Sequence, residues 1–124
     1  VQHTAFARDR LGPDPFLAPE VAVCLAPDRA AARQAAQGYL DTYLSLENYS
    51  RNLRRLGFGD EDLAGAGSDR LLDALVAWGD VEAIRARVRE HLDAGADHVC
   101  IQPLPPGDFQ LAQLRELAPA LLDL

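Results

Sequence analysis

A chain of 124 residues and 13.5 kDa is enough for one domain, and 48% apolar with 25% charged residues is typical of a folded chain. The formal net charge of −7 gives no general attraction for nucleic acid or an anionic membrane surface. The longest apolar run, Val21 to Ala26, is too short to cross a bilayer, and no basic-then-apolar signal segment opens the chain. We therefore expect a cytoplasmic protein with neither nucleic-acid nor membrane partners.

Two residue types are missing from the sequence. All basic residues are Arg, which excludes a Schiff-base lysine and a Walker-type phosphate lysine. Met is absent too, so we expect a processed product or a piece of a longer chain. The two cysteines, Cys24 and Cys100, lie in apolar strand-like runs, which predicts reduced, buried thiols.

The first third predicts a helix, a strand and a second helix. A short helix is expected over 4–10, with Thr4 as its cap. Residues 21–25 are apolar at every position, which indicates a strand buried on both faces, as in a parallel sheet. Asp28 is expected to cap a helix to about residue 44. Its inward stripe would be Ala31, Ala32, Ala35, Tyr39 and Tyr43 or Leu44.

Residues of about 46–75 read as a helical insertion. A helix over 47–56 would end at Gly57, and Asp69 is expected to cap a later helix. Residues 76–78 fit either a short strand or the end of that helix. The apolar stripe of the first of these helices would be Leu46, Tyr49, Leu53 and Leu56.

The last third predicts a helix capped by Asp80, a strand over 98–102, and a final helix capped by Asp108. The inward positions of the last helix would be Leu111, Leu114, Leu117 and Leu121. The whole order is that of an α/β protein.

The strand over 21–25 raises a question of burial. Helices on one side of two or three strands would leave the other face bare, although this strand is apolar on both faces. We therefore expect residues 1–124 to form a single partial domain. Its partner strands would come from the rest of a barrel, from a partner chain, or from a second copy in a homo-oligomer.

Three stretches carry a family resemblance. The run "VAWGDVEAIRARVREHLDAGADHVCIQPL" resembles the closing βα units of the luciferase-like oxidoreductases, a (β/α)8-barrel superfamily. The stretches "HTAFARDRLGPDPFLAPEVAVCL" and "LENYSRNLRRLGFGDEDLAGAGSDRLLDALVAWG" are similar to the branch that uses the deazaflavin coenzyme F420. The resemblance covers essentially the whole chain.

This resemblance implies the C-terminal portion of a (β/α)8 TIM barrel, with the helical insertion placed before strand seven. It implies an F420-dependent oxidoreductase that transfers hydride between a deazaflavin and a small organic substrate. This segment alone is expected to be inactive, since the resemblance puts most cofactor contacts in earlier strands. An FMN-dependent monooxygenase of the same superfamily is one alternative, and a non-catalytic α/β fragment acting through association is another.

Gln102 is the first candidate substrate-binding residue, because barrel chemistry lies beyond the C-terminal ends of the strands. It could bond a cofactor ring edge or a substrate carbonyl, or it could cap loop backbone.

The insertion supplies the other candidates, Tyr49, Asn52 and Arg55. Tyr49 and Asn52 lie close together on one helical face and could reach over the barrel mouth. Arg54 and Arg55 suit an anionic cofactor tail. The alternative is a solvated helix whose arginines pair with Glu47 or Asp60.

The remaining reactive side chains predict no chemistry. His91 is expected at the surface, and Trp78 is expected in the core or against a flavin. His98 and Cys100 would share a strand face, but two ligands are too few for a metal. Asp108 would repel an anion from the last helix. No catalytic residue and no metal ligand is assigned.

Overall fold

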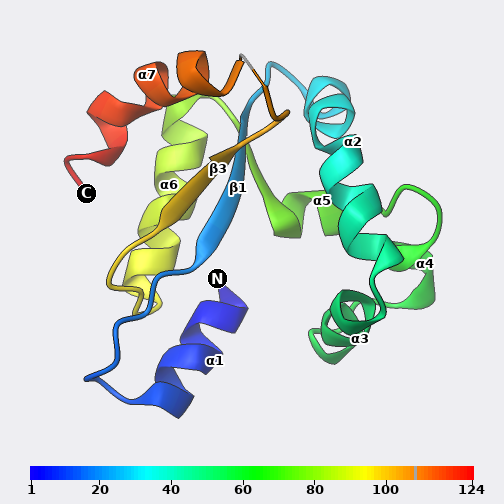
Figure 1. The fold of residues 1–124 in the computed structure, drawn as a ribbon, viewed down its shortest axis with the longest axis horizontal. Coiled ribbons are helices and arrows are strands. Elements are labelled where there is room, and N and C mark those ends of the chain that lie inside the picture. The colour runs from blue at the N-terminus through cyan, green and yellow to red at the C-terminus, as the bar shows by residue number, and fades with distance from the viewer. Residues whose placement is uncertain (108) are drawn as a thin grey trace.

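The computed structural model describes residues 1–107 and 109–124, and it has a mixed α/β fold (Figure 1). Its sheet consists of three parallel strands, β1 (Glu20–Leu25), β2 (Val76–Gly79) and β3 (Cys100–Pro103). The described residues form seven helices: α1 (Gln2–Leu11), α2 (Arg29–Ser45), α3 (Glu47–Arg55), α4 (Asp60–Leu63), α5 (Asp69–Leu75), α6 (Val81–Asp93) and α7 (Phe109–Leu121). The expected α/β class is confirmed, and residues 76–79 prove to be a strand.

Strand β1 lies in the middle of the sheet, in the order β2-β1-β3. Val23 pairs with Ala77 on one side and with Pro103 on the other. The chain thus moves outward from β1 to β2 and then crosses to the far side of β1. Right-handed crossovers in opposite directions place their helices on opposite faces of a sheet. In agreement, α2 lies on one side of the strands, and α6 and α7 lie on the other (Figure 1).

Alternate residues of β1 belong to two separate cores. Ala22 and Cys24 pack with α2, whose buried residues are Ala32, Ala36 and Leu40. Val21 and Val23 pack with α6 and α7, through Ile84, Val88 and Leu117. The expectation that one sheet face would be bare is therefore wrong, because the chain's own helices bury both faces of β1.

The strand order also differs from that of three successive barrel strands. Strands of a (β/α)8 barrel lie side by side in chain order, whereas β1 separates β2 from β3. Strands β1 and β3 do pair directly, with Val21 opposite Ile101. Among the described residues, no strand pairs with the outer edges of β2 and β3.

Most helix ends follow the predicted chemistry. Asp28 accepts a hydrogen bond from the N–H of Ala31, and Asp80 accepts one from Ala83, so both predicted caps are confirmed. Ser68, rather than Asp69, caps α5, because its Oγ accepts the N–H of Leu71 at 3.0 Å.

The first and last helices differ more from prediction. Thr4 lies inside α1 and is buried, so it is not a cap. Among the residues of α7 whose burial the structure describes, Leu117 alone is fully buried. Leu111 and Leu114 are exposed, so the predicted inward stripe was wrong at those two positions. The predicted Asp108 cap lies outside the described residues. Strand β3 begins at Cys100, two residues later than predicted.

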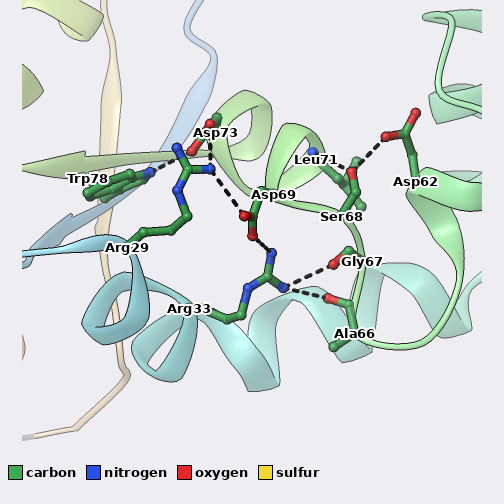
Figure 2. A network of polar contacts seen from close by, with 10 residues as sticks. All are labelled: Arg29, Arg33, Asp62, Ala66, Gly67, Ser68, Asp69, Leu71, Asp73 and Trp78. Atoms are coloured by element: carbon green, nitrogen blue, oxygen red, sulfur yellow. Dashed lines mark hydrogen bonds and ion pairs between the residues drawn. The ribbon is translucent and has the colours of Figure 1, made fainter.

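Two arginines of α2 form ion pairs and hydrogen bonds with the 46–75 segment (Figure 2). Arg29 contacts Asp73 at 2.9 Å and also lies over the ring of Trp78, whose indole N–H donates to Asp73. Arg33 contacts Asp69 at 2.5 Å and donates to two carbonyls of the preceding glycine-rich turn. These contacts hold α5 against α2 and thereby set the start of β2.

Helix α1 packs on the C-terminal end of α6. The Thr4 hydroxyl and the His91 Nδ1 lie 2.8 Å apart, and Arg8 donates to the Gly95 carbonyl and to Asp97. His91 is buried, so the expectation of a surface histidine was wrong. None of the described helices combines the length and the apolar character that a membrane-crossing helix needs.

Candidate functional site

A pocket of about 530 Å³ lies between α2 and the end of β3. One face of α2 forms its first wall, since residues spaced three or four apart share a helix face. The chain just after β3 forms the second wall. The lining residues are Gln34, Ala35, Gly38, Tyr39, Thr42, Tyr43, Gln102, Leu104, Pro105 and Pro106, none of which carries a formal charge.

Gln102 lies on the α2 side of β3. It pairs in register with Ala22, whose side chain belongs to the core beneath α2. Its side-chain oxygen, Oε1, is buried and has no hydrogen-bond partner among the described residues. Buried polar atoms are nearly always bonded in folded proteins, so this oxygen is an exception among the described residues, although it exposes almost no surface to the pocket.

Two glutamines of α7 bond the backbone that follows β3. Gln110 Nε2 donates to the Pro103 carbonyl at 3.0 Å, and Gln113 Nε2 donates to the Leu104 carbonyl at 2.7 Å. Gln113 also accepts the N–H of Leu25 at 2.8 Å, so it joins the ends of β1 and β3. These two loop carbonyls are thus satisfied without Gln102, and the alternative interpretation of Gln102 as a cap stays a prediction.

Three tyrosines form a ladder beside the pocket. The ring centroids of Tyr39 and Tyr43 are 4.4 Å apart, and those of Tyr43 and Tyr49 are 4.3 Å apart. Burial, together with hydrogen bonding to Tyr43, raises the pKa of Tyr39 well above its ordinary value. The phenol of Tyr39 therefore stays neutral at physiological pH, and the wall it forms is uncharged.

The four predicted substrate-binding residues do not come together. Gln102 lines the pocket. Tyr49 contacts the ring of Tyr43 but does not line the pocket. Asn52 and Arg55 are exposed on α3 and lie outside the lining.

The neighbouring arginines of α3 are engaged with acids. Arg51 contacts Glu47 at 2.5 Å and Arg54 contacts Asp60 at 2.8 Å, so the alternative of a solvated, salt-bridged helix is confirmed for these two.

A second depression of about 570 Å³ lies beyond the carboxyl ends of β1 and β2. Trp78, Asp80 and Glu116 line it. Trp78 is half-buried and packs against the core beneath α2, as expected for a core residue. The depression is broad, and its charged residues are acidic. The Trp78 indole N–H donates to Asp73 and the Asp80 carboxylate caps α6, so both contacts stabilise the fold.

The histidines and cysteines form no site. His98 lies before β3 rather than within it, and its ring stacks at 6.5 Å on Phe16. Cys100 is exposed, so the expectation of two buried thiols holds for Cys24 alone. No group of three or more potential metal ligands occurs in the described part of the chain.

Comparison with known proteins adds no assignment: no family model, curated protein or solved structure matches the chain.

Sequence reasoning missed the α2 wall of the pocket. Gln34, Gly38 and Thr42 lie among small and polar residues that read as an ordinary exposed helix face. One signal was available. Gly38 sits in the middle of a 17-residue helix, where glycine is unfavourable and often marks a place that needs space.

Proposed function

We propose that the chain is part of a luciferase-like F420-dependent oxidoreductase, which exchanges hydride between a deazaflavin and a small organic substrate. The enzyme class rests on the three resembling sequence stretches. The observation that carries the site is the place of Gln102, at the end of β3, in the lining of the uncharged pocket. Carboxyl ends of strands are where α/β proteins bind ligands.

In this proposal the chain's residues bind and orient, and the bound deazaflavin would supply the hydride chemistry. The uncharged pocket suits a ring system, with Gln102 at its edge and Tyr39 and Tyr43 along its side. It offers no cation for an anionic tail. That role falls to Arg55 on α3, with Tyr49 and Asn52 beside it on the same helix.

The proposal includes a (β/α)8 barrel, in which strands lie side by side in chain order. In such a barrel β2 would lie between β1 and β3, and a preceding strand would take the other edge of β1. Here β3 holds that edge of β1. Completing the barrel therefore requires β3 to leave β1, which makes the β1–β3 pairing a specific point at which this part of the proposal can fail.

The binding test is a titration of the chain with deazaflavin coenzyme, and with FMN in parallel, followed by coenzyme fluorescence. We expect deazaflavin to bind more tightly than FMN, and Gln102→Leu to weaken its binding about fivefold through the loss of one hydrogen bond. Gln37→Leu is the matched control, because Gln37 bonds Asp41 on the same helix and does not line the pocket. Tighter binding of FMN would favour the flavin monooxygenase alternative, and binding of neither would contradict the proposal.

A specific observation favours association as a second candidate. Leu111, Leu114 and Leu122 of the α7 region are 56%, 40% and 84% exposed, and their spacing puts them along one side of the helix. Sedimentation velocity over a concentration series tests it. A homo-oligomer that Leu111→Glu with Leu114→Glu dissociates would support association, and a monomer throughout would rule out self-association.

A further inference from the structure

We infer that the crevice between the carboxyl ends of β1 and β3 binds a small organic amine in its protonated form, and that the ammonium group of this amine pairs with the carboxylate of Glu116. Such a ligand is separate from the deazaflavin of the proposed enzyme. The crevice shares Ala35, Leu104 and Pro105 with the pocket between α2 and β3, and the end of β1 and one face of α7 complete its lining.

The place of the crevice follows from the order of the strands. β1 is followed by α2 on one face of the sheet, whereas β3 is followed by α7, which packs on the opposite face (Figure 1). The chain thus leaves two neighbouring parallel strands in opposite directions, which opens a space between their carboxyl ends. Such a point is where open α/β sheets bind ligands. A cavity of about 220 Å³ lies there, between Leu25 and Ala26 of the β1 end and Leu104 after β3.

Hydrogen bonds hold the walls of the crevice in place. Gln113 of α7 accepts the Leu25 N–H at 2.8 Å and donates to the Leu104 carbonyl at 2.7 Å, so it joins the two strand ends. The Ala26 N–H donates to the Gly79 carbonyl at 3.0 Å, which fixes the end of β1 against β2. A ligand therefore does not have to order these walls on binding.

The charge of the ligand follows from Glu116. Its carboxylate is the only formal charge in the crevice lining, and it also borders the broad depression at the ends of β1 and β2, where Asp80 is the other charged residue. Glu116 is exposed and takes part in no ion pair within the described part of the chain. Arg29 lies over the nearby ring of Trp78 but is already paired with Asp73. A cation therefore meets an unpaired carboxylate here.

The connection from β1 to α2 opposes an anionic ligand, although helix N-termini in α/β proteins often bind phosphate. Pro27 has no N–H, and the Ala26 N–H is bonded to the Gly79 carbonyl. The Asp28 carboxylate accepts the Ala31 N–H at 2.9 Å and so occupies the positive end of α2. A phosphate at this helix end would be repelled by Asp28.

The size of the ligand follows from the rest of the lining. Ala31 and Ala35 of α2 and Ala112 of α7 have short apolar side chains, which leave room for an apolar body. A volume of about 220 Å³ is below the usual range for drug-sized ligands, so the crevice holds one ring or a short branched chain.

Three probes of similar shape separate charge from size. Benzylamine is a cation at neutral pH, benzyl alcohol is its uncharged counterpart, and benzoate is an anion. Each is titrated at low salt into the ¹⁵N-labelled chain. Binding is followed by the backbone amides of Ala26 and Ala112 and the side-chain NH₂ of Gln113, which line the crevice but not the pocket between α2 and β3. Gly38 and Tyr43 report on that pocket.

We expect benzylamine to bind about fivefold more tightly than benzyl alcohol, which is what an exposed ion pair contributes, and benzoate to bind more weakly than either. About 1 M salt should remove this preference, because the Debye length then falls to about 3 Å. Glu116→Gln should bring benzylamine and benzyl alcohol to equal affinity.

Two further variants serve as controls. Asp123→Asn removes a carboxylate just after α7 that lines neither the crevice nor the adjoining depression, so it should keep the preference for benzylamine. Ala112→Leu should weaken the binding of all three probes, because the larger side chain would fill the crevice. Ala112 is exposed, so this change should leave the fold intact.

Four results would overturn the inference: equal binding of benzylamine and benzyl alcohol to the unaltered chain, tighter binding of benzoate, shifts confined to Gly38 and Tyr43, or no binding of any probe. None of these depends on a deazaflavin. A chain that prefers benzylamine but does not bind F420 would keep this inference and contradict the proposed enzyme class. A chain that binds F420 without this preference would contradict the inference alone.

Discussion

At the scale of single residues, two effects oppose each other at Gly38. Helix stability favours a side chain there, whereas the space of the pocket favours none. It lies inside α2, where glycine is about 1 kcal/mol less favourable than alanine. Its backbone is helical and its missing Cβ leaves open space, so nothing local opposes a methyl group. The residue is therefore explained by the room it leaves beside Tyr39 and Tyr43.

Gly38→Ala should raise the free energy of unfolding by about 1 kcal/mol, because the helix gains propensity and meets no clash. Urea unfolding measures it. Gly57→Ala is the matched comparison, since Gly57 has φ of +90° at the end of α3, and alanine there should destabilise. A Gly38→Ala chain that is less stable than the parent would show that the site is not open.

At the scale of elements, the contact between α1 and α6 contains a histidine whose pKa is strongly lowered. Burial, then the nearby N-terminal charge and Arg87, lower the pKa of His91 from 6.5 to about 4. The unfolded chain therefore takes up a proton near pH 6.5, while the folded chain resists protonation until about pH 4. Folding stability is complete above this range and falls as the pH decreases through it.

We expect the loss to be on the order of 1 to 3 kcal/mol, because each unit of pKa difference between the folded and unfolded chain corresponds to about 1.4 kcal/mol. Urea midpoints measured across this range should fall with decreasing pH in the parent chain. His91→Gln keeps a side-chain partner for Thr4 but does not titrate, so its slope should be shallower. His98→Gln, an exposed position, controls for removal of a histidine elsewhere. Equal slopes in the parent chain and His91→Gln would contradict the assignment.

The elements themselves could largely be predicted from the sequence, because their signals are local. Asp28 and Asp80 are caps that a reader finds by residue type and position. Ser68 competes with Asp69 for the same role, and residue type does not choose between them. The run 74–78 is apolar without a break, so the change from helix to strand at residue 76 is invisible in the pattern.

The candidate site could be predicted only in part, because it depends on how distant elements face one another. Gln102 was found from its place after a strand. The helical face of Tyr49 and Asn52 was found too, but a helical wheel does not say which way the face points in space. Whether a glutamine oxygen has a partner depends on Gln110 and Gln113, which lie elsewhere along the chain.

At the scale of the whole molecule, the sheet is arranged around β1. It is bonded to a strand on each side and covered by helices on both faces, whereas β2 and β3 each have an open edge. Pairing of β1 with β3 is also the feature that a complete barrel would have to change. The order in which the backbone amides of the three strands are protected from hydrogen exchange therefore tests this arrangement.

Backbone amides of β1 should exchange with solvent only through global unfolding, and those of β2 and β3 should exchange faster. Hydrogen exchange followed by mass spectrometry or NMR gives the order directly. Slowest exchange in β2 would place that strand in the centre and contradict the order β2-β1-β3. Equal protection in all three would fit a sheet that has no edges.

The two faces of the sheet also differ in how their packing responds to high pH. The side that packs on α2 holds Cys24 and Tyr39, and burial raises the pKa of each above its ordinary value of 9.0 and 10.0 respectively. Above those values the unfolded chain ionises before the folded one, so stability falls as the pH rises. Strong base should therefore weaken the packing of α2 on the strands, whereas mild acid should weaken the contact between α1 and α6 in the opposite layer.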